Sequence, residues 1–114
     1  MEHKFDFNKL GVCLNPLVLW NYDTGYYPEA KIEIAKIGEK WDSSFNWMTL
    51  RGGESSPVSM AKYSSEEAAI DAAIARARKK MDYIKSLCRN ESEFNKLHES
   101  FLRFIASRTQ LTLF

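Results

Sequence analysis

The order of apolar and polar residues predicts strands in the first half of the chain and helices in the second. Runs rich in β-branched and aromatic residues, separated by turn residues, predict strands at residues 17–22, 30–37, 41–50 and 58–63. Apolar residues that recur every three or four positions predict two helices, which start after Ser64 and after Asn90. Strands followed by helices indicate one α+β domain, with an antiparallel sheet of three to four strands and two C-terminal helices packed on one face of the sheet.

The second face of this sheet is not uniformly polar. In the strand predicted at residues 41–50, Phe45 and Trp47 lie on one face, while Met48 and Leu50 lie on the other. A strand with only one covered face normally alternates apolar and polar residues. We therefore expect the second face to be either covered or a contact surface, which a second copy of the chain or another partner would occupy.

The segments between and before these elements predict an N-terminal arm, a loop and two helix caps. Residues 1–16 are expected to form a loose arm with room for a short helix, and the Gly-rich residues 51–57 are expected to form a loop. Ser64 and Glu67 have the spacing of a capping box at the start of the first helix, and Asn90 is expected to cap the second helix.

Size and composition fit one folded domain. The 114 residues are 45% hydrophobic and 27% charged, which is too apolar a mixture for a disordered chain. There are 16 basic and 15 acidic residues, so the net charge of +1 indicates neither a strongly cationic nucleic-acid binder nor an acidic DNA mimic. We assign residues 1–107 to the domain and residues 108–114 to a flexible C-terminal peptide tail.

The compartment that we expect is the cytoplasm. Cys13 and Cys88 lie far apart in the chain and belong to no CxxC pair, which favours free thiols over a disulfide framework. The apolar residues 10–20 are interrupted by Asn15 and Pro16, and no run approaches the roughly 20 apolar residues that span a bilayer. We therefore expect no contact with a membrane.

The sequence contains no recognisable catalytic pattern. His3 and His98 have no Cys, Ser or acidic neighbour in a known nucleophile arrangement. The Gly-rich residues 51–57 lack the Lys-Ser/Thr pair of a phosphate-binding loop. We predict no catalytic residue, no cofactor and no metal site, and therefore a protein that is not an enzyme.

A basic stretch on the first predicted helix suggests nucleic-acid binding. Four cations are expected on the outer side of this helix, where they could contact phosphate: Arg76, Arg78, Lys79 and Lys80. Four strand aromatics could stack on unpaired bases: Trp20, Tyr22, Trp41 and Trp47. The alternative is an ordinary solvated helix face and a core that contains the aromatic residues.

The last five residues, 110–114, read Gln-Leu-Thr-Leu-Phe. This stretch resembles the short peptide by which many bacterial DNA polymerases, repair proteins and replication regulators bind the sliding clamp of DNA polymerase III, a motif commonly written Gln-Leu-Ser/Asp-Leu-Phe. Thr112 stands where Ser or Asp is usual, at a position where the family pattern is permissive. A location at the extreme C-terminus is typical of such peptides.

The resemblance implies a role for each matching residue. Gln110 would hydrogen-bond in a small polar pocket of the clamp, and Leu111 would sit at the rim. Leu113 and Phe114 would fill the main hydrophobic cleft, so the clamp is the partner that we expect. The alternative is an edge strand of the chain's own sheet, because Leu111 and Leu113 alternate with polar residues.

Residues 31–77 resemble small accessory domains of phages, plasmids and integrated elements. The shared pattern is a strand, a turn before Trp, a second strand, a Gly-Gly-Ser-Pro loop and an alanine-rich helix that opens with Ser-Glu-Glu-Ala. The resemblance implies an accessory protein of a phage or mobile genetic element that is recruited to the clamp. An alternative is an anti-defence protein, such as an anti-CRISPR or anti-restriction inhibitor, that binds a host nuclease through its sheet or helix surface.

Overall fold

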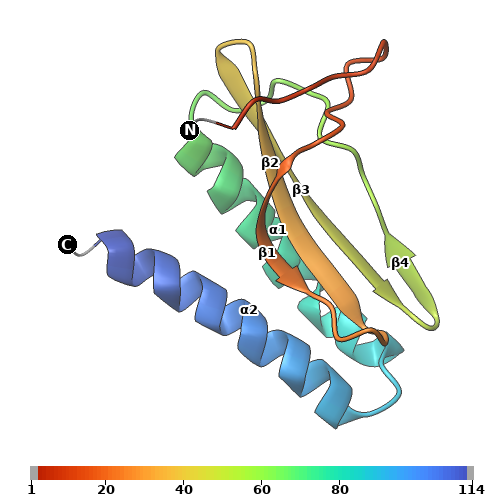
Figure 1. Cartoon of the computed structure of the whole chain (residues 1–114). Coiled ribbons are helices and arrows are strands. Elements are labelled where there is room, and N and C mark those ends of the chain that lie inside the picture. Colours follow the sequence, from red (N-terminus) through yellow and green to blue (C-terminus); the bar gives the residue numbers. More distant parts are fainter. Residues whose placement is uncertain (1–2, 113–114) are drawn as a thin grey trace.

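Four antiparallel strands form one layer of the molecule, and two helices form the other (Figure 1). The computed structural model describes the backbone of residues 3–112 and the side chains of residues 3–108. The strands lie side by side in chain order: β1 (Leu17–Tyr22), β2 (Glu29–Ile37), β3 (Lys40–Thr49) and β4 (Gly52–Glu54). The helices are α1 (Glu66–Leu87) and α2 (Glu91–Thr112). This arrangement confirms the predicted α+β class, with both helices on one face of the sheet.

Alternation along β2 and β3 places their apolar residues under the helices. Ile32 lies opposite Phe45, and Ala30 lies opposite Trp47; all four side chains belong to the main core. A two-residue turn joins the two strands. Its first residue, Gly38, has a φ of +63°, in the left-handed region that glycine adopts without a steric penalty.

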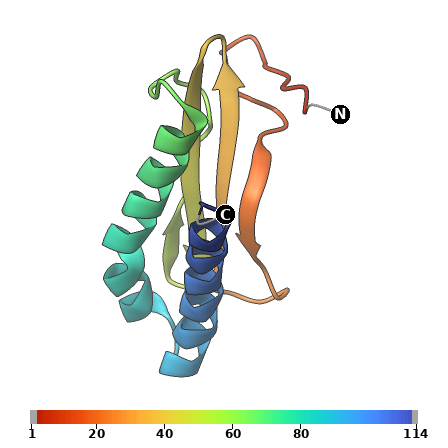
Figure 2. The same cartoon turned by 90° about the vertical axis from the view of Figure 1, so that its left-hand side faces the viewer.

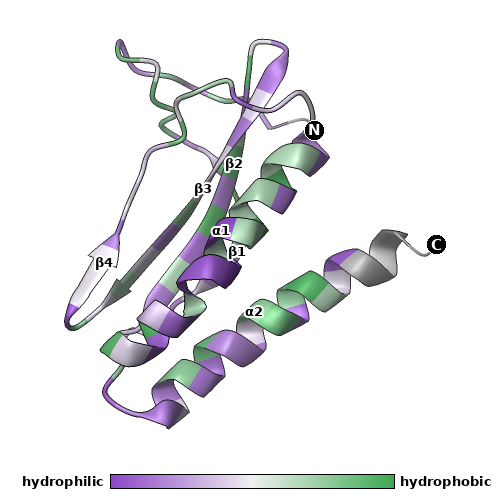
Figure 3. Cartoon of the chain, turned by 180° about the vertical axis from the view of Figure 1, so that it is seen from behind, coloured by the Kyte–Doolittle hydropathy of each residue, from purple (hydrophilic) through white to green (hydrophobic). Residues whose placement is uncertain are grey.

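Each helix contributes one apolar stripe to this core. The buried stripe of α1 includes Ile70, Ala73, Ala77, Met81 and Ile84. The buried residues of α2 are Phe94, Leu97 and Phe101. Figure 3 shows hydrophobic and hydrophilic residues in turn along both helices, as expected for helices with a single buried face.

The helix starts agree with the sequence to within one residue. α1 is capped by Ser65 rather than by Ser64, because the backbone N–H of Ala68 donates to the Ser65 hydroxyl at 3.1 Å. Two consecutive serines offer the same capping chemistry, so spacing alone could not choose between them. Asn90 caps α2 as predicted, and its side chain accepts from the backbone N–H of Glu93 at 3.0 Å.

The fourth strand does not lie where the sequence indicated. β4 belongs to the Gly-rich segment expected as a loop, and residues 58–63 form only an isolated bridge between Trp41 and Tyr63. Gly53 explains the first error: a Cβ atom there would lie 2.4 Å from the Trp47 carbonyl oxygen, so only glycine lets the strands pair this closely. Asp42 explains the second, because its carboxylate accepts the backbone N–H groups of Ser59 and Met60.

The N-terminal arm has no helix within residues 3–16. An isolated bridge between Phe7 and Cys13 closes a turn. The Asn8 side chain accepts from the backbone N–H groups of Leu10 and Val12. These local bonds satisfy the backbone groups that a short helix would otherwise pair.

The second face of the sheet is covered over one half only. Near the β2–β3 turn, the arm and the segment after β4 bury a small cluster of Cys13, Ala35 and Val58, with Phe5 beside it. The other half, near the β1–β2 connection, is open, with Val18 and Met48 partly exposed.

α2 extends further than the sequence indicated. Residues 108–112 were assigned to a tail, but their backbone belongs to α2, and no Gly or Pro interrupts residues 107–112. Residues 113–114 lie outside the described part of the chain. Neither described helix is long and apolar enough to cross a membrane.

Candidate binding surfaces

The predicted clamp-binding peptide begins inside the last turn of α2. Gln110 and Leu111 belong to the helical backbone, but their side chains lie outside the described residues. Leu113 and Phe114 lie outside them entirely. The roles assigned to these four residues therefore stay predictions. The structure does show where the peptide is carried: Figures 1 and 3 show the far end of α2 diverging from the sheet.

An ionic contact between the helices precedes this peptide. The Arg108 guanidinium lies 3.9 Å from carboxylate oxygens of both Glu67 and Asp71 on α1. Together with Arg78 and Ile105, these residues line a shallow hollow of about 540 Å³ between α1 and α2. Two carboxylates of α1 thus face Arg108 of α2 across this hollow, in long and largely exposed ion pairs that contribute little stability.

Arg76 does not belong to an outward basic face. Its guanidinium donates to the Ser43 carbonyl oxygen at 2.9 Å and to the Ser43 hydroxyl at 3.0 Å. It also donates to the Tyr63 hydroxyl at 3.2 Å. The expectation that four cations share the outer side of α1 is therefore wrong for Arg76, because a long side chain at the edge of the buried stripe reaches the sheet.

The other three predicted cations point in different directions. Lys80 forms an ion pair with Glu54 of β4 at 3.0 Å, and Arg78 lines the hollow between the helices. Lys79 and Arg78 are both exposed, and neither forms an ion pair or hydrogen bond among the described residues. The structure thus does not bring Arg76, Arg78, Lys79 and Lys80 together as one phosphate-binding stripe.

The strand aromatics are also occupied within the fold. Trp20 is buried against Phe101, with ring centroids 5.4 Å apart, and its indole N–H donates to the Ser100 hydroxyl at 3.0 Å. Trp47 is 3% exposed. Tyr22 packs against the core, and Trp41 meets Phe5 edge-on. Base stacking on Trp20 or Trp47 would require the fold to open, whereas Tyr22 and Trp41 are half-buried.

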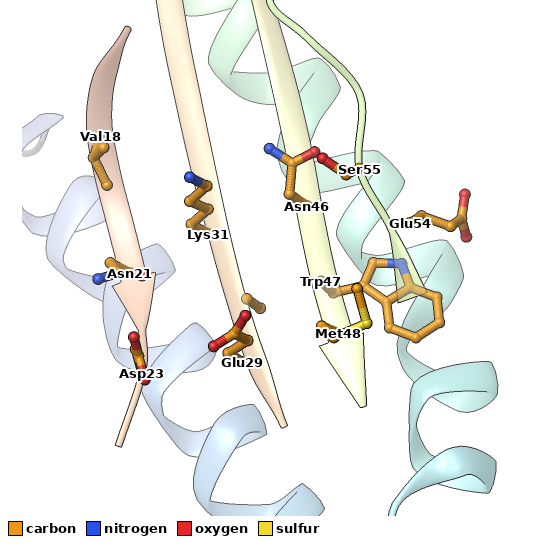
Figure 4. A pocket seen from close by; sticks show the side chains of 11 residues that line it. Val18, Asn21, Asp23, Glu29, Lys31, Asn46, Trp47, Met48, Glu54 and Ser55 are labelled. Carbon is orange, nitrogen blue, oxygen red and sulfur yellow. The ribbon is translucent and has the colours of Figure 1, made fainter. Parts of the chain in front are cut away.

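The sequence did not reveal a hollow of about 420 Å³ on the open half of the sheet (Figure 4). We call it the sheet hollow. Its lining includes Val18, Asn21, Asp23, Glu29, Lys31 and Met48. Alternation along β2 places Lys31 on this face. Only the order of the strands shows that Asp23, which follows β1, also lines the hollow.

A polar ladder on the sheet includes two residues that line the sheet hollow, Lys31 and Asn46. The Asn46 amide donates to the Glu33 carboxylate at 3.1 Å and to the Ser44 hydroxyl at 3.3 Å. Lys31 lies 3.6 Å from the other Glu33 oxygen. The Asn46 carbonyl oxygen accepts the backbone N–H of Ser56 at 2.7 Å. Each of these polar groups therefore has a hydrogen-bond or ion-pair partner, as buried polar groups in folded proteins usually do.

Three groups near the connection between α1 and α2 have shifted pKa values. Burial, followed by the charge of Glu93, raises the pKa of the Cys88 thiol. Burial is also the main cause that raises the pKa of Tyr22, with Cys88 and Glu93 adding to it. A hydrogen bond from Arg89 lowers the pKa of Glu93. A thiol with a raised pKa is a weak nucleophile at neutral pH, so Cys88 has the character of a structural residue.

The described residues contain no group of three or more His, Cys, Asp or Glu side chains placed to hold a metal ion. Comparisons with protein-family models, with curated proteins and with solved structures gave no match.

Proposed function

We propose that this protein is a non-enzymatic accessory protein of a phage or bacterial mobile element that docks on the replication sliding clamp through residues 110–114. The observation that carries the proposal is the Gln-Leu-Thr-Leu-Phe stretch itself. It agrees with the clamp-binding pattern in the type and order of Gln110, Leu111, Leu113 and Phe114.

Docking requires the peptide to leave the helix. The resemblance implies a flexible peptide that becomes ordered on the clamp, whereas the backbone of residues 110–112 belongs to α2. Residues 110–112 would therefore unwind on binding. Unwinding breaks the hydrogen bonds that their N–H groups donate to carbonyl groups four residues earlier, and each such bond contributes only about 0.5 to 1.5 kcal/mol net. The last turn of α2 also has no basic residue that would stabilise the negative end of the helix dipole.

The energy balance favours weak, exchangeable binding. The cost of ordering the peptide backbone offsets much of the gain from burying two large apolar side chains in the cleft. We therefore expect a dissociation constant on the order of micromolar for so short a peptide. Arg108, just before the peptide, lies 3.9 Å from carboxylates of α1, so the peptide starts beside the folded body.

The test is binding of purified bacterial sliding clamp to the full chain and to a Leu113→Ala, Phe114→Ala variant, measured by surface plasmon resonance. The variant should lose binding while its thermal unfolding midpoint stays within about 2 °C of the parent, because surface substitutions change stability little. Leu102→Ala is the matched control, since Leu102 is an exposed leucine of α2. Equal binding by both variants would refute docking through residues 110–114, and a large loss of stability would favour the edge-strand alternative.

A second candidate function is inhibition of a host nuclease by surface binding. The observation that favours it is the open half of the sheet, which carries the sheet hollow beside partly exposed Val18 and Met48. An anti-CRISPR or anti-restriction inhibitor would keep its activity when residues 110–114 are deleted, whereas a clamp-dependent accessory protein would lose it. Cleavage assays with purified host nucleases and the two chains separate these roles.

A further inference from the structure

β1 is an edge strand whose outer side is unpaired. It pairs with β2 only, and no other backbone hydrogen bond joins Leu17–Tyr22 to the described part of the chain. In Figure 2, β1 lies at the right-hand side of the sheet, and no helix or other strand lies beyond it. α2 reaches β1 from the inner face alone, through the contacts of Trp20 with Phe101 and Phe104.

The two edges of the sheet differ in how they are protected. β4 has three residues, two of them glycines, and is too short to pair with another chain over any length. β1 has six residues, Leu-Val-Leu-Trp-Asn-Tyr, with no charge and no proline. Its single protective feature is a bulge between Val18 and Trp20. Natural sheets usually block such an edge with lysine or proline, and an unblocked edge is a template for an extended peptide.

The sheet hollow lies beside this edge. Val18 and Asn21 line it from β1, while Glu29 and Lys31 line it from β2 (Figure 4). A strand added to β1 would place every second side chain on this open face. Those side chains would meet the β1 wall of the hollow, which is apolar at Val18 and polar at Asn21.

The charges around the sheet hollow favour a basic side chain. Two of its charged residues are neutralised, Lys31 by Glu33 and Glu54 by Lys80. Asp23 and Glu29 have no cationic partner among the described residues, and Figure 4 shows them at the same end of the hollow. The backbone N–H of Gly25 holds one Asp23 oxygen at 2.9 Å, which fixes this carboxylate in place.

We propose that β1 is the docking edge for an extended peptide segment of another protein that carries Lys or Arg. The segment would add to the sheet as a fifth strand, with its basic side chain beside Asp23 and Glu29. Strands lie roughly 4.8 Å apart, so a Lys or Arg side chain on the added strand reaches Asp23 at the end of β1. This inference goes beyond clamp docking and does not depend on residues 110–114.

The test is an NMR titration of the ¹⁵N-labelled full chain with synthetic peptides. The probe is an acetylated and amidated octapeptide in which Val alternates with Arg. We expect shifts of the backbone amides of residues 17–23 and 29–31, with half-saturation at or below about 1 mM, a typical weak-complex affinity. The same peptide with Glu in place of Arg should bind at least about tenfold more weakly, because like charges oppose each other. A peptide N-methylated at every residue should not bind, because both of its edges lack the N–H donors that pair with a strand edge.

Two pairs of variants complete the test. Asp23→Asn with Glu29→Gln should weaken the Arg peptide about threefold to tenfold, the range for two partly exposed charge contacts. Asp82→Asn with Glu99→Gln removes two exposed carboxylates from the helices and should leave binding unchanged. Val18→Lys should abolish binding, and Leu102→Lys should not, although Val18 and Leu102 are about equally exposed, at 48% and 49%.

Three outcomes would overturn the proposal. The first is the absence of shifts along β1 up to the solubility limit of the Arg peptide, and the second is equal binding of the N-methylated peptide. The third is sedimentation of the parent as a dimer that Val18→Lys converts to a monomer, because a second copy would then occupy the edge. Clamp binding is measured separately, with the Leu113→Ala, Phe114→Ala variant. Failure of the β1 docking proposal is therefore distinguishable from failure of the clamp-docking proposal.

Discussion

Arg76 shows most clearly how a single residue can depart from the sequence pattern. Its position in a basic run suggested a phosphate contact, but three hydrogen bonds to Ser43 and Tyr63 make it a brace between α1 and the sheet. Periodicity predicts which face of a helix a Cα atom occupies. It does not predict where a long side chain at the boundary of that face ends.

We predict that Arg76→Ala lowers the free energy of unfolding by about 1 to 3 kcal/mol, because the Ser43 carbonyl and the Tyr63 hydroxyl lose a charged donor. Lys79→Ala should change it by less than about 0.5 kcal/mol, since Lys79 is exposed and unpaired among the described residues. Urea denaturation at neutral pH measures both. Equal effects of the two substitutions would show that Arg76 is an ordinary surface cation.

Cys88 and Tyr22 predict a loss of stability at alkaline pH. Both groups have a raised pKa in the folded state, so the folded protein holds their protons more tightly than the unfolded chain does. This stability is fully present below the ordinary thiol pKa of 9.0 and is lost as pH rises through the folded pKa. Thermal unfolding from pH 7 to pH 10.5 should show a falling midpoint, and Cys88→Ala should reduce the slope above pH 9. An unchanged slope in that variant would exclude the thiol as a cause.

At the scale of whole elements, a strong hydrophobic periodicity was enough to predict a helix or strand, and a weak periodicity was not. The apolar stripe of α1 and the alternation of β2 lie as predicted, because each pattern reports one buried face directly. β4 was missed because Gly52 and Gly53 are turn residues in most contexts. The strand predicted at residues 58–63 does not form, because Asp42 takes two backbone N–H groups of that segment.

Gly53 gives the element-scale prediction. Gly53→Ala should destabilise the fold by about 1 to 3 kcal/mol, the usual cost of an added methyl group in a filled site. The new Cβ atom would lie 2.4 Å from the Trp47 carbonyl oxygen and 2.9 Å from the Met48 Cα, and neither backbone atom can move without breaking the β3–β4 pairing. Ser56→Ala, just beyond β4, is the control and should be close to neutral. Chemical denaturation compares them, and a neutral Gly53→Ala would mean that β4 is not closely paired with β3.

At the scale of the whole molecule, the sequence could predict the class of the fold but only part of its surfaces. The open half of the sheet follows from where the arm and the segment after β4 lie, which depends on contacts such as that of Cys13 with Val58. No local pattern encodes these contacts. In our proposal the Gln-Leu-Thr-Leu-Phe stretch is the reverse case, because its role would depend on a partner's pocket and not on this fold.

The most direct measurement of the central claim is competition for the clamp. A fluorescently labelled Gln-Leu-Thr-Leu-Phe peptide is bound to purified bacterial sliding clamp, and its anisotropy is followed as unlabelled full chain is added. We predict that the full chain displaces the peptide with an affinity within about a hundredfold of that of the free peptide, because release of residues 110–112 from α2 breaks hydrogen bonds of about 0.5 to 1.5 kcal/mol each and a tenfold change in affinity corresponds to about 1.4 kcal/mol. The chain that lacks residues 110–114 should not displace it. Failure of the full chain to compete, or equal competition by the shortened chain, would contradict docking through these residues.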